Sequence, residues 1–505
     1  MKYTKLMLCA AALLACGAAF AQRFDDDFDS FDSFDSFDAS SREKAVDVHG
    51  QVELSLRYFV DGNQSEFDSF GDMPLDVVPQ GNLDFSYEGS KADVELKLAF
   101  NEDIIKNYPR KVIDELTMRA YLGSVTIEAG DMKVVWGKGD KLHVLDNFNA
   151  NDYYYFLIPD YIDRRIAEPM VRVAWNCPWD FFLHSFRIEG IYTPMMTADR
   201  LGTGRWTPAQ VTAITDRVTT LAGTKVATMQ AEAITAIKDS NPLAPQLLAA
   251  YTRALSQSGT LKDNLYPNTY RLKYGQAGIR MTGTIGIVDT GLSYYYGHYK
   301  QPSVDASKID SYITRYLAGA ATEDDKFLSY DALHVFGAEA GMAVGPVNLR
   351  AELAYYLTHD VQGTDAAVRN NSVNWLFGFD WNIPVSNLNV NVQTVGQYIV
   401  KNSEIKSNGA LDTEYDANGI YSNNKIMLNI SDSYNHEKIQ PSVTFIYGIE
   451  RGDFIIKPEL TVNVFGGLDA IASGMYITHF YDRDKSEFAS FTHNSFVSLG
   501  MRYTF

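Results

Sequence analysis

Apolar and polar residues alternate without interruption through the end of the chain, residues 496–505. One face carries Val497, Leu499, Met501, Tyr503 and Phe505, and the residues between them are small, polar or charged. A period of two residues predicts a β-strand with one apolar and one polar face.

The first predicted strand, residues 46–58, shows the same alternation. Its apolar set is Val and Leu with a final Tyr, and its polar face carries Asp47, His49, Gln51, Glu53, Ser55 and Arg57. Charges of both signs are costly in a dry core unless they are paired, whereas a water-filled lumen accepts them. We therefore expect this polar face to line a pore, with Asp47, His49, Gln51, Glu53 and Arg57 as pore-lining candidates and Arg172 as a further one on a later strand.

The two ends of the chain together point to a membrane barrel. The last strand ends in Phe505 with Tyr503 two positions before it, and the chain begins with a secretory signal. This combination resembles the C-terminal recognition strand of bacterial outer-membrane β-barrels. The resemblance implies that Tyr503 and Phe505 form an assembly signal read by the barrel-assembly machinery, that the last strand pairs with the first, and that the outer face contacts outer-membrane lipid.

The spacing of turns predicts the number of strands. Short turns built on Gly or Pro are expected at 88–90, 123–124, 177–178, 283–284, 345–346, 383–384 and 451–453. Between them lie eight longer connections at 61–80, 101–115, 137–167, 194–267, 298–330, 358–371, 401–435 and 467–492. Strict alternation of short and long connections predicts an all-β, transmembrane antiparallel β-barrel of about 16 strands. Residues 425–431 and 475–481 also alternate, so 18 strands are possible.

The fourth long connection, 194–267, predicts helices in an extracellular loop. Residues 207–210 read as a capping box with Pro208 at the first helical position, and apolar residues then recur at helical spacing in three stretches, divided at Gly223 and at Asn241–Pro242. Amphipathic helices bury their apolar stripe. They either pack on one another and on neighbouring loops, or they form a lid or plug over the mouth of the barrel.

The N-terminal region predicts export. Residues 1–21 read as a signal peptide ending in Ala19-Phe20-Ala21, although Leu13-Leu14-Ala15-Cys16 also resembles a lipobox that would place a lipid on Cys16. Residues 22–44 contain an acidic Phe-Asp-Ser repeat, which we expect to be a disordered periplasmic tail; its spaced Phe residues offer contacts to a periplasmic partner. The barrel is expected to occupy 45–505, in the cell outer membrane.

Composition excludes several function classes. Removing Lys2 and Lys5 with the signal takes the formal charge from −19 to −21, which disfavours nucleic acid as a partner. After cleavage Cys177 is the one remaining cysteine, and neither a Gly-x-Ser-x-Gly, a His-Glu-x-x-His nor a P-loop motif is present. We therefore expect no enzyme activity, no catalytic residues, no metal site and no cofactor.

Residues 118–165 carry the densest group of motifs. They include Arg119-Ala120-Tyr121, a strand led by Gly130 and ending in Trp136-Gly137, and an Asp- and Asn-rich loop, 146–152. This stretch resembles a poorly characterised family of outer-membrane barrels allied to alginate-exporter-like porins. The family commonly has Gly-Arg-Gln and Asn-Pro where this chain has residues 130–132 and 149–150, so the resemblance leaves the solute open.

The third long connection, 137–167, follows that strand. In general porins, which the strand count resembles, the third loop folds inward and narrows the pore. Charged rings of this kind set ion preference. The constriction candidates are therefore the loop's charged residues, Asp140, Asp146, Asp152, Asp160, Asp163, Arg164 and Arg165. Alternatively, these charged residues belong to an exposed loop and only face water.

The sequence as a whole indicates a porin-like channel for passive diffusion or uptake of small solutes. The alternative is a surface adhesin or structural barrel whose loops matter and whose lumen does not conduct.

Overall fold

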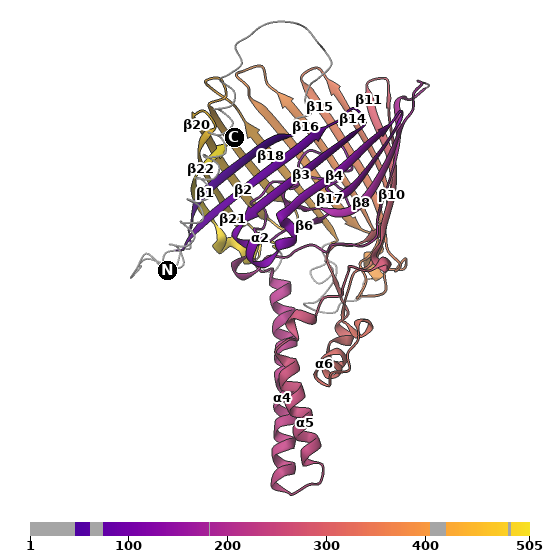
Figure 1. Ribbon diagram of the computed structural model, residues 1–505, viewed down its shortest axis with the longest axis vertical. Coiled ribbons are helices and arrows are strands. Elements are labelled where there is room, and N and C mark those ends of the chain that lie inside the picture. The colour runs from indigo at the N-terminus through magenta and orange to yellow at the C-terminus, as the bar shows by residue number, and fades with distance from the viewer. Residues whose placement is uncertain (1–45, 61–73, 181, 405–420, 483–485) are drawn as a thin grey trace.

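The computed structural model describes residues 46–60, 74–180, 182–404, 421–482 and 486–505. Eighteen strands form one closed antiparallel barrel (Figure 1). Each strand pairs with its neighbours along the chain, and the last strand pairs with the first. The predicted antiparallel barrel is confirmed, with eighteen strands instead of sixteen. The signal peptide 1–21, Cys16 and the acidic tail 22–44 lie outside the described residues.

The barrel strands are mostly 9 to 14 residues long, the length that a tilted strand needs to cross a bilayer. They are β1 (Asp47–Phe59), β2 (Leu75–Glu88), β3 (Ala92–Asn101), β4 (Ile113–Leu122), β5 (Val125–Met132), β8 (Glu168–Asn176), β9 (His184–Thr193), β10 (Gln276–Ile285), β11 (Val288–His298), β14 (Ala332–Val344), β15 (Val347–Leu357), β16 (Ser372–Asn382), β17 (Asn389–Ile399), β18 (Ser422–Ser431), β19 (Ile439–Gly448), β20 (Asp453–Phe465), β21 (Leu468–His479) and β22 (Phe496–Thr504).

Two of these strands lie in stretches that the sequence predicts as long connections. Strand β18 contains the alternating residues 425–431, and β21 contains most of 475–481. Consequently the chain turns at 451–453 on the long-loop side of the barrel instead of the short-turn side. The short turn expected at 283–284 was also misplaced, because those residues continue β10 and the chain reverses at Gly286, which has a φ of +61°.

The alternation predicted from the sequence separates the two faces of the wall. Large apolar side chains point outward and are exposed, as Leu353, Phe377 and Leu499 are. Carboxylates such as Glu339 and Glu352 point inward and are buried. This is the arrangement of a barrel whose outer face meets lipid and whose interior is polar, and it implies a bacterial outer membrane.

The first and last strands are joined at the short-turn end. Gly50 and Phe505 exchange backbone hydrogen bonds, with the N–H of Gly50 at 2.9 Å from the Phe505 carbonyl oxygen. A Cβ at position 50 would lie 2.7 Å from the Phe505 ring. Glycine therefore lets the terminal aromatic ring pack directly on the first strand.

Helices occur in the long connections. They are α2 (Glu102–Asn107), α3 (Tyr161–Arg164), α4 (Ala209–Lys238), α5 (Ala244–Ser258) and α6 (Ile309–Leu317), with short two-residue strands β6 (Ala150–Asn151), β7 (Arg165–Ile166), β12 (Ser303–Val304) and β13 (Leu328–Ser329). None of the helices in the described ranges is long and apolar enough to cross a membrane.

The helical insertion expected in the fourth long connection is present. Helices α4 and α5 form a hairpin that projects from the long-loop end, away from the barrel (Figure 1), so it is not a plug. Gly223 does not divide the first two stretches but lies inside the 30-residue α4. The capping box is wrong, because Pro208 is the N-cap and no side chain caps the helix. The buried stripe of the hairpin packs on α6 through residues including Val218, Ala254 and Ile313.

Candidate functional site

The third long connection, 133–167, folds into the barrel. Its apolar side chains Trp136, Val144, Leu145 and Phe148 are buried against the inner wall. The rings of Phe148 and Tyr295 of β11 meet edge to face, with centroids 5.0 Å apart. We call this connection the inner loop. The inner loop packs against the half of the wall that runs from β8 to β17.

One carboxylate of the wall holds the start of the inner loop. Glu352 of β15 accepts backbone N–H groups from Lys138 at 2.8 Å, Gly139 at 2.6 Å and Val144 at 2.8 Å. Gly137 has a φ of +111°, and a Cβ there would lie 2.2 Å from the Glu352 carboxylate. The sharp turn that wraps the loop around Glu352 therefore requires glycine.

Two amides complete the anchoring of the inner loop. The side-chain oxygen of Gln393 in β17 accepts the N–H of Leu142 at 3.2 Å. Asn149 joins the loop's two ends, since it accepts the N–H of Val134 at 2.8 Å and donates to the carbonyl of Ile166 at 2.9 Å. The N–H groups of Val134 and Leu142 lie outside any strand, so these side chains supply the acceptors that a neighbouring strand would have supplied.

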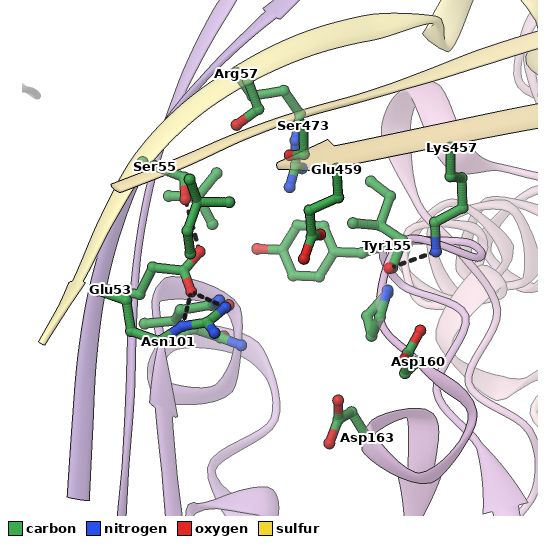
Figure 2. A pocket seen from close by; sticks show the side chains of 18 of the residues that line it. Glu53, Ser55, Arg57, Asn101, Tyr155, Asp160, Asp163, Lys457, Glu459 and Ser473 are labelled. Atoms are coloured by element: carbon green, nitrogen blue, oxygen red, sulfur yellow. Dashed lines mark hydrogen bonds and ion pairs between the residues drawn. The ribbon is translucent and has the colours of Figure 1, made fainter. Parts of the chain in front are cut away.

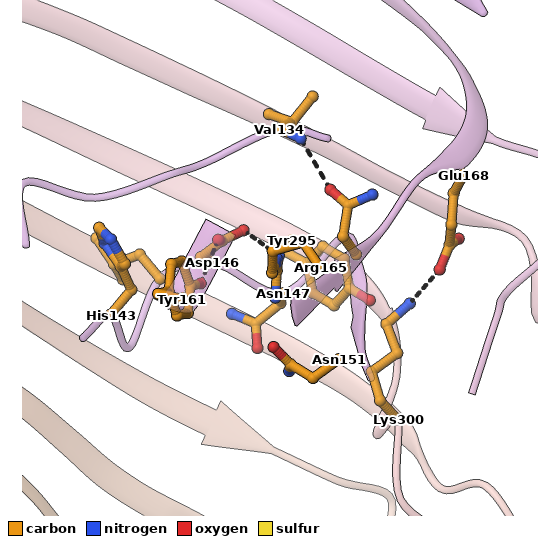
Figure 3. A network of polar contacts seen from close by, with 12 residues as sticks. Val134, His143, Asp146, Asn147, Asn151, Tyr161, Arg165, Glu168, Tyr295 and Lys300 are labelled. Atoms are coloured by element: carbon orange, nitrogen blue, oxygen red, sulfur yellow. Dashed lines mark hydrogen bonds and ion pairs between the residues drawn. The ribbon is translucent and has the colours of Figure 1, made fainter. Parts of the chain in front are cut away.

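Buried charges fix the far part of the inner loop (Figure 3). Asp146 accepts from Arg165 at 2.6 Å and also from the hydroxyl of Tyr161, and burial raises the pKa of Tyr161 well above its usual value. In the same network, to the right in Figure 3, the ammonium of Lys300 lies 3.3 Å from the carboxylate of Glu168 at the start of β8. Burial lowers the pKa of Lys300, although Glu168 opposes that effect.

A cavity of about 560 Å³ separates the inner loop from the opposite half of the wall (Figure 2). That half is formed by β1 to β4 and β18 to β22. The lining carries acidic and basic side chains, which are Glu53, Asp103, Asp114, Asp152, Asp160, Asp163 and Glu459, with Arg57, Lys111, Lys141, Lys457 and Arg502. The cavity is therefore polar and contains charges of both signs.

Hydrogen bonds from β20 and an ion pair from the second long connection hold the inner loop from across the cavity. Lys457 of β20 donates to the carbonyl of Leu157 at 2.9 Å and to that of Ile158 at 3.0 Å. Lys111 lies 3.1 Å from Asp152. The inner loop is thus held on both sides of the lumen, and its position defines the width of the cavity.

Three of the six pore-lining candidates line the cavity and three do not. Gln51, Glu53 and Arg57 line the cavity. Asp47 and His49 do not; both are exposed at the short-turn end of β1. Arg172 is also outside the cavity lining, because it is engaged on the inner wall by Glu128 at 3.1 Å and by Glu189 at 2.7 Å.

The constriction candidates divide in the same way. Asp152, Asp160 and Asp163 line the cavity. The others do not. Asp146 and Arg165 are buried against each other, Asp140 accepts from Asn391 of the wall at 3.1 Å, and Arg164 lies 6.0 Å from the ring of Tyr153. The loop follows no period, so neighbouring charges face opposite sides.

Some cavity residues were missed by the sequence reasoning. They are Lys457 and Glu459 on the inner face of β20, Lys141 and Tyr155 on the inner loop, and Asp103 and Lys111 in the second long connection. Residues 457 and 459 occupy alternate positions of a strand, so the same alternation that identified β1 could have found them.

Aromatic side chains gather above the cavity at the long-loop end. Phe156 of the inner loop stacks on Trp206 with centroids 5.6 Å apart, and its ring lies 4.5 Å from that of Phe491. The strand ends contribute Phe59 and Phe496 to the same buried cluster. We call these five residues the mouth cluster. It joins the inner loop to the root of the α4–α5 hairpin.

No protein-family model matches the chain, and no curated protein sequence matches it. Among solved structures it is similar to a mutant of the Rhodopseudomonas blastica porin at 10% identity and to a triple mutant of that porin at 11%. Each alignment covers 91% of this chain and 100% of the porin, with a TM-score of 0.36. By its own strand order and apolar outer face, the chain is a closed, 18-stranded antiparallel β-barrel of the membrane-spanning kind, with its third long connection folded inward.

Proposed function

We propose that this protein is an outer-membrane channel through which small polar solutes diffuse passively. One observation carries the proposal: the inner loop leaves a charged, polar cavity of about 560 Å³ between itself and one wall of the barrel. Barrels of this size hold an aqueous lumen unless something fills it. Here the loop fills one half and leaves the other open to polar side chains.

The anchoring of the inner loop supports a pore of fixed width. Glu352, Gln393 and Lys457 hold it at separate points on the wall. A rigid constriction selects solutes by size and charge without a conformational change, as passive diffusion requires. Export by a signal peptide, insertion by the barrel-assembly machinery and the absence of catalysis belong to the same proposal.

Conductance of the refolded protein in a planar lipid bilayer tests the channel. We expect ion-conducting steps, and we expect small sugars to swell liposomes that contain the protein while large ones do not. A Glu53→Cys variant in a Cys177→Ser background should lose current when treated with a small water-soluble thiol reagent. Leu54→Cys, one residue away on the lipid face, is the matched control and should be unaffected. Absence of any current would overturn the channel.

The α4–α5 hairpin favours a second candidate function, surface attachment. The 30 residues of α4 extend over about 45 Å at the rise of an α-helix. Apolar side chains are exposed near its tip, including Ile234, Ile237 and Leu243. If the barrel does not conduct but intact cells lose adhesion when the tip is removed, attachment replaces diffusion as the function.

A further inference from the structure

Arg57 is a buried cation, and two of its three guanidinium nitrogens have no acceptor among the described residues. The residue is 7% exposed, lies on the inner face of β1 and lines the cavity. Within the described part of the chain its Nε and Nη1 atoms have no hydrogen-bond partner. A buried unpaired guanidinium is costly, and such a group in a native protein calls for an explanation.

The neighbours of Arg57 leave its donors available. Its guanidinium carbon lies 4.7 Å from the ring centre of Phe496 and 5.9 Å from that of Tyr155. Stacking on a ring occupies the flat faces of a guanidinium and leaves the N–H groups at its edge for a planar anion. Figure 2 shows the side chain extending into the space that Tyr155 and Glu459 also enter.

The nearest acid on the same strand is already engaged. Glu53 accepts the hydroxyl of Ser55 at 2.8 Å and the guanidinium of Arg502 at 3.0 Å. Its two oxygens therefore serve other donors. Asp76 of β2 lies directly opposite Arg57 in the strand register, but among the described residues the two form no ion pair, so Nε and Nη1 remain available to a carboxylate that enters the cavity from outside.

Carboxylates elsewhere in the cavity lining suit a positively charged group of the same ligand. Among the described residues, no hydrogen bond or ion pair reaches the side chain of Glu459 or that of Asp163, and Asp160 has only Lys141 at 3.4 Å. Glu459 belongs to β20, while Asp160 and Asp163 belong to the inner loop. Lys457, two residues before Glu459 on the same strand, donates to the carbonyls of Leu157 and Ile158, so the carboxylates of Glu459 and Asp163 remain open to a ligand's cationic group while its anion meets Arg57.

The separation of the two sides indicates the length of that ligand. Strands β1 and β20 are three strand spacings apart along the wall, or about 14 Å. Both side chains extend inward and shorten this span. A peptide of two or three residues is at most about 7–11 Å long and carries one charge at each end.

We propose that the cavity is a binding site for short zwitterionic peptides, with the C-terminal carboxylate on Arg57 and the N-terminal ammonium on Glu459 and Asp163. The site rests on the proposed channel function, since it gives the diffusing solute a chemical class. A zwitterion places an opposite charge against each of the two sides, which an uncharged sugar does not.

Calorimetric titration of the refolded barrel in detergent micelles tests the site directly. The probes are trialanine, trialanine amide, which lacks the carboxylate, and N-acetyl-trialanine, which lacks the ammonium. We expect trialanine to bind at least about tenfold more tightly than either derivative, as loss of one charge-assisted hydrogen bond requires. Equal binding of all three, or no binding of any, would overturn the site.

Variants assign the two ends. Arg57→Gln should weaken trialanine about tenfold and leave trialanine amide unchanged, while Glu459→Gln should spare N-acetyl-trialanine. The control Arg187→Gln removes another inner-wall arginine, one that pairs with Glu189 outside the cavity lining, and should change no affinity. If Arg57→Gln fails to fold, Arg57→Lys, which keeps the charge but not the bidentate geometry, should still bind trialanine less tightly.

Conductance of the same preparations separates this inference from the channel. A barrel that conducts but binds no peptide removes the peptide site and leaves the channel in place. A barrel that binds trialanine through Arg57 and does not conduct removes the channel and leaves the site.

Discussion

The carboxylate of Glu352 accepts the backbone N–H of Gly139 at 2.6 Å, although 213 residues separate the two in the chain. The same carboxylate holds two further N–H groups of the inner loop within 2.8 Å. One side chain of β15 thus replaces the backbone partners that a strand would have supplied. The position of the constriction depends on it.

Replacing Glu352 should loosen the inner loop without opening the barrel. Glu352→Gln removes the charge that strengthens these bonds and turns one acceptor into a donor that faces N–H groups, at a cost of about 2–4 kcal/mol. We expect larger and noisier single-channel currents and faster protease cleavage within the loop. Glu339→Gln is the matched control, because Glu339 is equally buried on the inner wall but pairs with Arg280 at 2.5 Å. Identical currents from both variants would contradict the anchoring role.

The mouth cluster, and not the length of the helical hairpin, should control access from outside. Trp206→Ala removes the ring that stacks on Phe156, so we expect conductance to rise. Replacing 230–250 with a short Gly-Ser linker removes only the projecting tip, so conductance should not change. A rise in current from the tip deletion would show that the hairpin bends back over the mouth.

Ion selectivity should depend on pH through Asp163. Burial, opposed by Lys133 and helped by Asp160, raises the pKa of Asp163 above its usual value. Its carboxylate therefore becomes neutral at a higher pH than an ordinary aspartate, and one negative charge leaves the cavity wall. As the pH falls below neutral, the cation-to-anion permeability ratio, measured from reversal potentials in a salt gradient, should therefore begin to decrease at a higher pH than an ordinary aspartate would give. Asp163→Asn should lower that ratio at pH 7 and reduce its further change on acidification.

Neutralising Asp146 should act on stability instead of selectivity. Asp146 and Arg165 are both buried, so Asp146→Asn leaves an unpaired guanidinium at a cost of about 3–5 kcal/mol. We expect a lower denaturation midpoint in tryptophan fluorescence and little change in ion preference. Asp160→Asn, which faces the cavity, should show the opposite pattern. A selectivity change from Asp146→Asn with unchanged stability would place that side chain in the pore.

The sequence predicts the wall better than the loop. Alternation identified the inner face of β1, because a strand's period assigns every second residue to one side. It placed β18 and β21 inside long connections, although the alternation at 425–431 and 475–481 left 18 strands open. It misplaced the end of β10 because Gly283 resembles a turn residue, whereas the left-handed backbone that reverses the chain falls at Gly286.

The sequence does not show which charged residues of the inner loop face the cavity and which face the wall. Asp146 and Asp152 stand in the same acidic stretch, yet one is buried in an ion pair and the other lines the cavity. That difference is set by contacts with Glu352, Gln393 and Lys457, which lie more than 200 residues away in the chain. A local sequence pattern gives no information about contacts with residues so far away in the chain.

The seam between β1 and β22 has a consequence for biogenesis. The first and last strands, whose pairing closes the barrel, also supply much of the open wall, including Glu53, Arg57 and Arg502. The ion pair between residues 53 and 502 and the stacking of Arg57 on Phe496 both require these two strands to be paired. The charged half of the lumen is therefore complete only when the first and last strands have paired, so closure of the barrel and formation of the charged cavity depend on the same contacts.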